Sequence, residues 1–323
     1  HSAPLQQPST MANQLLASAG NVVKSMNLSL LSSPPPSTEE SGQDICYLGP
    51  NGESDSHHVI HCKDLPEGLR EMVGSWYIHP DRHVVEYIAF VTISSIIIRT
   101  LLPTLSKYPA KKAFNLNPPL FMKIATLFIY VCQIAYKVNG YPGKVLFMAM
   151  PCNILWTMWT ALCFLPLKTQ TKHIMYQIII PYTILSVVAV AAPDLSGLDL
   201  PLEVPFFFII HIALIAYPIY FLLSGRISVI PSGDDGLVLN FLKWWILACA
   251  YFALFYFGVA VPLSVVFGIN VNYMLSPPPA PADMFMSGPN FRLQSTLCCA
   301  AAFFFFQFVV TATAVFGRTM GKS

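Results

Sequence analysis

The sequence predicts an all-α membrane protein: a polytopic bundle of about seven transmembrane helices that follows a polar N-terminal region. Hydrophobic residues make up 54% of the 323 residues and charged residues 11%, well below the ~25% of soluble domains. Seven apolar segments come close to the ~20 residues that a helix needs to cross the hydrocarbon core. Stretches rich in proline, glycine and charged residues separate these segments, as expected for connecting loops.

The N-terminal region, residues 1–83, is polar. Within it, residues 11–31 place leucine, valine and methionine side chains three, four and seven positions apart, which predicts an amphipathic helix. Such a helix can lie on a membrane surface or dock on a partner protein. Residues 32–44 are typical of an irregular linker. We therefore expect a polar tail and loop region at 1–83 and a transmembrane domain at 84–323.

The predicted transmembrane domain contains the seven apolar segments in succession. They lie at about 84–105, 119–138, 145–167, 174–193, 205–224, 240–268 and 295–316. The sixth is long enough to tilt or kink, and Pro262 supplies a cause because proline removes a backbone hydrogen-bond donor. The net charge of +2 and the lack of any lysine- or arginine-rich block argue against nucleic acid as a partner. Membrane lipids are the expected surroundings.

Polar residues inside the apolar segments converge on one level of the membrane. Consecutive spans alternate in direction, and basic residues favour a cytoplasmic C-terminal side and an outside or lumenal N-terminus. Counted from the N-terminal side, Cys152 lies about seven residues inside the third span and His211 about six residues inside the fifth. At 1.5 Å per residue both lie ~10 Å below the same surface. Asn270 and Asn272 end the sixth span on that side as well.

Cys152 and His211 could together form an activated thiol, with Cys152 as the nucleophile and His211 as the base. Polar groups at this depth are costly and usually face the interior of a bundle. A histidine within reach can take the thiol proton, and the thiolate can then attack an acyl carbonyl. Asn270 and Asn272 could orient the histidine or donate to an oxyanion. The alternative is structural: Cys152 is a small buried hydrophobe beside a helix bend at Pro151, and His211 bonds a neighbouring helix.

Two further groups of residues lie in the N-terminal region. His57, His58, His61 and Cys62 cluster, but their spacing matches no standard zinc site, so a solvated or partner-facing loop is the simpler interpretation. Cys46 and Cys62 could form a disulfide if they face an oxidising compartment. The sequence shows no glycine-rich phosphate loop and no paired carboxylates within the spans. We expect no cofactor and no metal, with bound phospholipids as ligands.

Four short pieces of the sequence resemble the transmembrane protein 164 family and its bacterial relatives. They are the Pro151–Cys152 step, IIHIALIAYPIYFLL at 209–223, NVNYMLSP at 270–277 and SGPNFR at 287–292. Their order and spacing match that family over residues 84–320. Each piece is short, and together they are moderately specific.

The resemblance implies a multi-span membrane protein with acyltransferase activity. The implied reaction moves a polyunsaturated acyl chain from a phospholipid to an ether lysophospholipid. Cys152 then corresponds to the nucleophile and His211 to the histidine of the fifth span. Asn270 and Asn272 correspond to the asparagine pair that follows the sixth span.

The sequence departs from this family at two places. Vertebrate members have a histidine directly after the cysteine, where this chain has Asn153, which we count as a supporting residue of the site. They also have a histidine near the start of the seventh span, where Ser295 and Thr296 stand. Losing nearby bases weakens activation of the thiol.

Two functions of different classes follow. The favoured one is an integral membrane accessory subunit of a larger membrane complex, with residues 1–45 docking on partner subunits. This proline- and serine-rich tail has no core of its own, so it needs a partner to become ordered. A chain that starts at His1 also suggests processing, and the mitochondrial inner membrane is then the expected location. The alternative is a thiol-dependent phospholipid acyltransferase that uses Cys152 and His211, in the endoplasmic reticulum or Golgi membrane.

Overall fold

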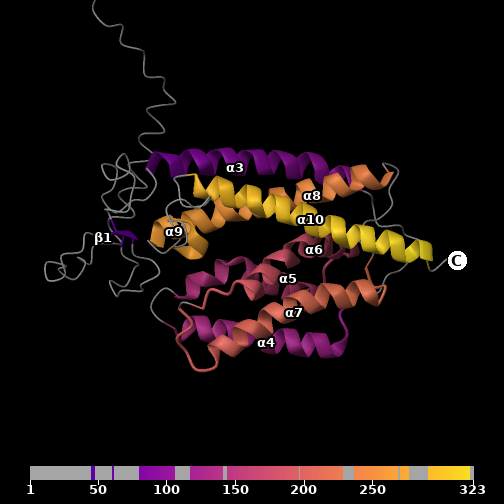
Figure 1. Ribbon diagram of the computed structural model, residues 1–323, viewed down its shortest axis with the longest axis horizontal. Helices are drawn as coiled ribbons and strands as arrows, with labels where there is room; N and C mark the ends of the chain where they lie inside the picture. Colours follow the sequence, from indigo (N-terminus) through magenta and orange to yellow (C-terminus); the bar gives the residue numbers. More distant parts are fainter. Residues whose placement is uncertain are drawn as a thin grey trace, which may run out of the picture. The chain divides into compact units, whose positions relative to one another are not determined.

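Figure 1 shows the computed structural model of the chain, which describes residues 45–47, 60–61, 80–105, 117–140, 144–195, 197–227, 236–267, 270–275 and 290–320. The predicted helix at 11–31 lies outside the described residues, as does the tail at 1–45 apart from Ile45. The chain divides into two compact units. The first contains His1–Thr92 and Tyr256–Phe291, and the second contains Ile93–Phe255 and Arg292–Ser323.

Helices dominate the described residues. The longer ones are α3 (Pro80–Leu101), α4 (Leu120–Val138), α6 (Thr169–Ala191), α7 (Glu203–Leu223), α8 (Gly236–Phe255) and α10 (Phe291–Met320). The shorter ones are η3 (Leu102–Thr104), η4 (Lys144–Ala149), α5 (Pro151–Phe164), η5 (Tyr256–Ala260), α9 (Val261–Phe267) and η6 (Val271–Tyr273). Two short strands, β1 (Ile45–Tyr47) and β2 (Ile60–His61), pair in antiparallel fashion.

Six stretches among the described residues are long and apolar enough to cross a membrane. They are Arg82–Thr104, Leu120–Val138, Thr169–Ala191, Glu203–Leu223, Gly236–Phe267 and Phe291–Thr313. Helix α4 illustrates why lipid suits them: Leu120, Ile124 and Phe128 lie four residues apart on one face and are 72%, 62% and 65% exposed. The predicted class, an all-α polytopic membrane bundle, is confirmed.

The third predicted span, 145–167, is shorter than expected. Met150 has an extended backbone, because the residue before a proline is pushed away from the helical conformation. Pro151 is the first residue of α5, a position where its missing N–H leaves no bond unmade. The helix has 14 residues, so it is about 21 Å long and shorter than the ~30 Å hydrocarbon core. Pro151 therefore begins a helix and does not bend a longer one, which corrects the expected helix bend.

The sixth predicted span is interrupted beside its proline. The α-helical geometry of α8 ends at Phe255, and the π-helix η5 follows before α9 begins at Val261. Pro262, the second residue of α9, lacks the N–H that would bond the carbonyl four residues earlier, within η5. A widened turn accommodates the missing hydrogen bond, as is common where an α-helix contains a π-bulge.

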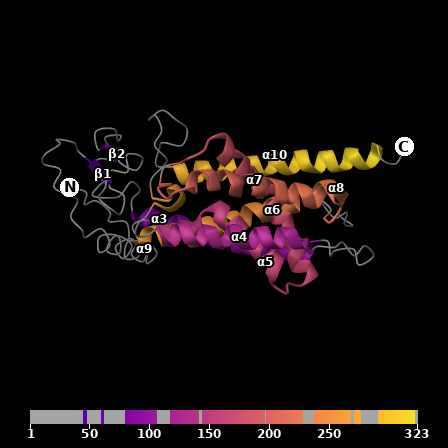
Figure 2. The same ribbon diagram turned by 90° about the horizontal axis from the view of Figure 1, so that it is seen from below.

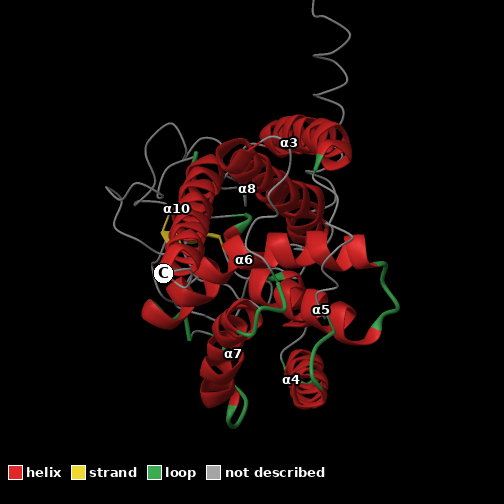
Figure 3. Ribbon diagram, turned by 90° about the vertical axis from the view of Figure 1, so that its right-hand side faces the viewer, coloured by secondary structure: helices red, strands yellow, loops and turns green. Residues whose placement is uncertain are grey.

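Helices α4 to α8 of the second unit alternate in direction, so α4 and α6 end where α5 and α7 begin (Figures 1 and 2). Figure 3 views these helices from one end and shows α5 between α4 and α6, with α7 close to α5. An aromatic cluster packs α5 in place: the Trp159 ring centroid lies 5.6 Å from that of Tyr176, 5.3 Å from that of Tyr217 and 5.4 Å from that of Phe221. Burial of Trp159 is complete.

Candidate functional site

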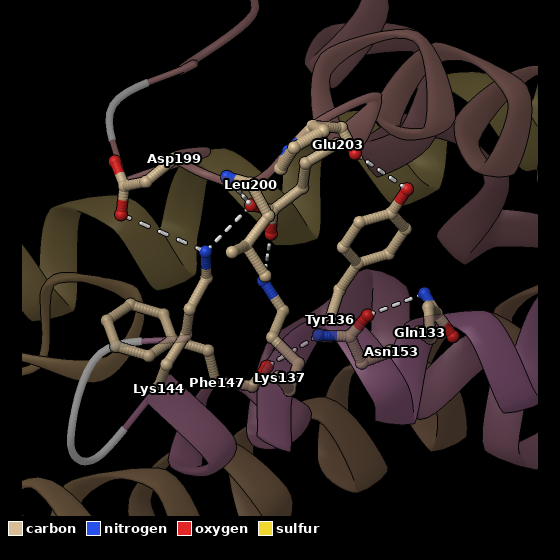
Figure 4. A network of polar contacts seen from close by, with 10 residues as sticks. Gln133, Tyr136, Lys137, Lys144, Phe147, Asn153, Asp199, Leu200 and Glu203 are labelled. Atoms are coloured by element: carbon tan, nitrogen blue, oxygen red, sulfur yellow. Dashed lines mark hydrogen bonds and ion pairs between the residues drawn. The ribbon is translucent and has the colours of Figure 1, made fainter. Parts of the chain in front are cut away.

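A layer of charged and polar side chains lies where α4 ends and α5 and α7 begin (Figure 4). The Lys144 ammonium lies 2.7 Å from Oε2 of Glu203, and both side chains are almost fully buried. The Lys137 ammonium lies 3.7 Å from Oε1 of the same carboxylate, and its side chain is 14% exposed. Asp199, which is largely exposed, lies 4.0 Å from Lys144 at the rim. Two lysines therefore share one buried carboxylate.

Local structure explains why these charges gather there. Glu203 is the first residue of α7, where a carboxylate interacts favourably with the helix dipole. The Leu200 backbone N–H donates to Oε2 of Glu203 over 3.2 Å. Lys137 occupies the last turn of α4, the favourable end for a cation. Gly140 leaves room for the stem of Lys144, because a Cβ at that position would collide with it.

Asn153 ties the first turn of α5 to its neighbours. Its Oδ1 accepts a hydrogen bond of 2.6 Å from Nε2 of Gln133 on α4, and its Nδ2 donates one of 2.6 Å to the Phe147 carbonyl of η4. Asn153 and Gln133 are both 2% exposed. Buried polar groups must find partners, so this chain of amides holds the start of α5 in a defined position. Asn153 was predicted to support the site, and in the structure it holds the turn of α5 that contains Cys152.

Cys152 is the second residue of α5 and lies outside the six candidate spans. The residue is partly exposed. Burial raises the pKa of this thiol, whereas the nearby Lys137 ammonium and the backbone N–H groups of Cys152 and Asn153 act to lower it. The first turn of a helix has unpaired N–H groups and a positive dipole end, both of which favour a thiolate.

His211 lies on α7, where it is buried. Its Nδ1 lies 2.7 Å from the Phe207 carbonyl. Because a carbonyl only accepts, Nδ1 carries the hydrogen, and the lone pair of the neutral ring is on Nε2. Among the described residues, the polar and ring contacts recorded for His211 are with Phe207, and none reaches Cys152.

The contact between Trp156 and Tyr217 sets α5 against α7. Cys152 comes four residues before Trp156, and His211 comes six before Tyr217, so the two differ in height by only about 3 Å at 1.5 Å per residue. At 100° per residue, however, His211 lies about 120° around α7 from Tyr217. The two predicted catalytic residues thus share a level, while His211 occupies a different face of its helix from the one that meets α5.

Asn270 and Asn272 belong to the first unit, whereas Cys152 and His211 belong to the second. Asn270 is buried, and its Oδ1 accepts a hydrogen bond of 2.7 Å from the Leu275 backbone N–H. Asn272 has a φ of 51°, a left-handed conformation that asparagine tolerates better than most residues. Both asparagines therefore shape the turn that follows α9.

Sequence reasoning missed Lys137, Lys144, Glu203 and Gln133. Their position in the sequence was the signal that could have identified them, because they lie at or near the ends of helices. Consecutive spans alternate in direction, so these helix ends come to the same side of the membrane. Among the described residues, no group of three histidine, cysteine, aspartate or glutamate side chains is arranged to hold a metal ion. His57, His58 and Cys62 lie outside the described residues.

Fold and site together define a polytopic membrane protein with a cysteine at the start of a short helix, beside a buried ionic layer. Residues 78–311 match the sequence model of the TMEM164 family, and the chain belongs to this family. A relative described as "Transmembrane protein 164 homolog", from Dictyostelium discoideum, is 28% identical over 179 residues. That match covers 54% of this chain and 61% of the relative's length. No solved structure matches the chain.

Replacing Asn153 with alanine is expected to lower the free energy of unfolding by about 2–3 kcal/mol, because the amide of Gln133 and the carbonyl of Phe147 each lose a buried partner. Unfolding of the purified protein in mild detergent measures the change. Asn139→Ala serves as control, because Asn139 is exposed and, among the described residues, its side chain bonds its own helix through Ala135. Equal stability of the two variants would contradict the role assigned to Asn153.

Proposed function

We propose that the protein transfers acyl chains between phospholipids through a thioester on Cys152. The observation that supports this most is the placement of a partly exposed cysteine in the first turn of α5, next to a layer with two lysines and one buried carboxylate. Membership of the TMEM164 family is consistent with the proposal. The substrates would be a phospholipid donor and an ether lysophospholipid acceptor.

The reaction has two balanced halves. The Cys152 thiolate attacks the ester carbonyl of the donor, a C–S bond forms, and the ester C–O bond breaks. The departing lysophospholipid alkoxide takes a proton. The acceptor hydroxyl then attacks the thioester and gives up its proton, so a new ester C–O bond forms and the C–S bond breaks. Nothing is oxidised or reduced, and the proposal requires no cofactor.

His211 is the candidate for moving these protons. Its Nε2 carries the lone pair of the neutral ring, because Nδ1–H is used by Phe207. Cys152 and His211 lie at similar heights on α5 and α7, so a rotation of the His211 side chain or an intervening water would be needed to join them. Substrates would enter sideways from the lipid at the end where α5 and α7 begin. The endoplasmic reticulum or Golgi membrane is the location that fits this chemistry.

Capture of the thioester tests the proposal. Purified protein is incubated with phosphatidylcholine vesicles that carry a labelled polyunsaturated chain, with no acceptor present. Label is expected on the peptide that contains Cys152, and neutral hydroxylamine should release it, because thioesters react with hydroxylamine faster than oxygen esters do. Cys132→Ala, which removes a partly buried thiol on α4, should leave the label in place. Transfer in the presence of acceptor without any label at Cys152 would refute the proposal.

The accessory-subunit interpretation depends on residues 1–45, and all of these except Ile45 lie outside the described residues. It therefore stays a prediction, as does the mitochondrial inner membrane as its location. Co-purification of a constant set of partner subunits in mild detergent is the expected result if it holds. Loss of those subunits on deletion of residues 1–44 would assign the docking role to the tail.

A further inference from the structure

The ionic layer beside Cys152 carries an excess of positive charge at its buried centre. Lys144 and Glu203 form a close pair at 2.7 Å, which leaves the charge of that pair balanced. Lys137 forms a longer ion pair with the other oxygen of the same carboxylate, at 3.7 Å. Asp199 contacts Lys144 from the rim and is 63% exposed, so solvent screens it. Lys137 is therefore paired less closely with Glu203 than Lys144 is.

Lys137 lies on α4 near the start of α5. Lys137 follows Gln133 by four residues, so the two side chains lie on the same face of α4. Gln133 bonds Asn153, the residue next to Cys152. Lys137 extends from this face toward Glu203 on α7 (Figure 4), and it interacts electrostatically with the Cys152 thiol. The Lys137 cation thus belongs to the turn of α4 that follows the contact with the start of α5.

The other ionisable groups around Lys137 and Cys152 come from the neighbouring elements. They are Tyr136 on α4, Lys144 on η4, Asp199 before α7, and Glu203 and His211 on α7. The last turns of α6, residues 184–191, contain none. Tyr136 donates its hydroxyl hydrogen to the Pro201 carbonyl, and His211 is bonded to Phe207, so neither supplies a positive charge to the thiol.

We infer that Lys137 is a positioning residue whose positive charge, shared with Glu203, favours the thiolate form of Cys152 against the effect of burial. This inference rests on the nucleophile of the proposed function and goes beyond it. The first turn of α5 adds its N–H groups to the effect.

The test measures how the alkylation rate of Cys152 by iodoacetamide depends on pH. The full chain in mild detergent is used, and Cys152 and Cys132 are quantified separately by peptide mass spectrometry. Removing a nearby cation raises the pKa of a thiol, so Lys137→Gln should move the Cys152 profile to higher pH. At a fixed pH below the midpoint of the Cys152 profile, alkylation of Cys152 should be about tenfold slower in Lys137→Gln than in the chain with Lys137. The Cys132 profile serves as the internal reference.

Two variants separate charge from structure. Lys137→Arg keeps the positive charge and should retain the original profile, whereas a loss of packing alone would shift both variants. Lys168→Gln removes an exposed lysine beyond the far end of α5 and should change nothing. An unchanged profile in Lys137→Gln, or equal shifts in the glutamine and arginine variants, would overturn the inference. The result is independent of acyl transfer: a missing thioester refutes the proposed function, while the alkylation profile alone decides the role of Lys137.

Discussion

Replacing Cys152 with alanine is expected to lower the rate of acyl transfer by at least about 10²-fold, because no other group in the reaction can hold the acyl chain covalently. The fold should persist, since alanine fits the space of a small side chain that is already partly exposed. Transfer is measured with purified protein in vesicles that contain a labelled phospholipid donor and an ether lysophospholipid acceptor. Elution volume and unfolding temperature report the fold.

Cys132→Ala is the matched control, since it removes a partly buried thiol from α4 and should transfer at the original rate. Cys152→Ser tests the same point more narrowly, because it changes one atom and yields a far weaker nucleophile near neutral pH. Full activity in either Cys152 variant would exclude a thioester mechanism. Activity lost in both Cys152→Ala and Cys132→Ala would indicate general damage to the fold.

Replacing Lys144 with methionine is expected to lower the free energy of unfolding by about 3 kcal/mol, because the change leaves the Glu203 carboxylate buried without its closest partner. Lys137 lies 3.7 Å from the other Glu203 oxygen and can move closer to it. The expected loss of stability is therefore near the lower end of the range measured when one partner of a buried ion pair is removed. Unfolding in mild detergent measures the effect. The start of α7 should lose order first, since Glu203 is its first residue.

A second substitution distinguishes the charge from the packing of Lys144. The double variant Lys144→Met with Glu203→Leu removes both buried charges and should recover much of the lost stability, because the desolvation of both groups is avoided. Lys168→Met, on an exposed lysine, should change stability by less than about 0.5 kcal/mol. A single Lys144 variant as stable as the Lys168 variant would show that the pair contributes little.

The fold class was predictable because it depends on composition and segment length. An apolar stretch of about 20 residues must satisfy its backbone internally in lipid, so helices are the outcome regardless of the details of packing. The third segment shows the limit of this reasoning. Hydropathy runs without a break through 145–167, but Pro151 and Pro166 restrict the helix to Pro151–Phe164. Local backbone geometry, which hydropathy does not register, decided its length.

The candidate site was predictable only in part. Cys152 stands out because it follows a proline within an apolar segment, and His211 because an imidazole is rare inside such segments. Whether they meet depends on how α5 and α7 are rotated about their axes, and the spacing of residues within one helix carries no such information. The same holds for Lys137 and Glu203, which are 66 positions apart (203 minus 137) yet share an ion pair.

The sequence by itself determined that this chain is an all-α membrane protein of the TMEM164 family. Tertiary structure alone decided that Lys137 and Lys144 converge on Glu203 and that Asn153 joins α5 to Gln133. The physical reason is the distance along the chain over which each effect acts. Hydropathy and proline act within one segment, whereas a buried charge is stabilised only by partners from other helices.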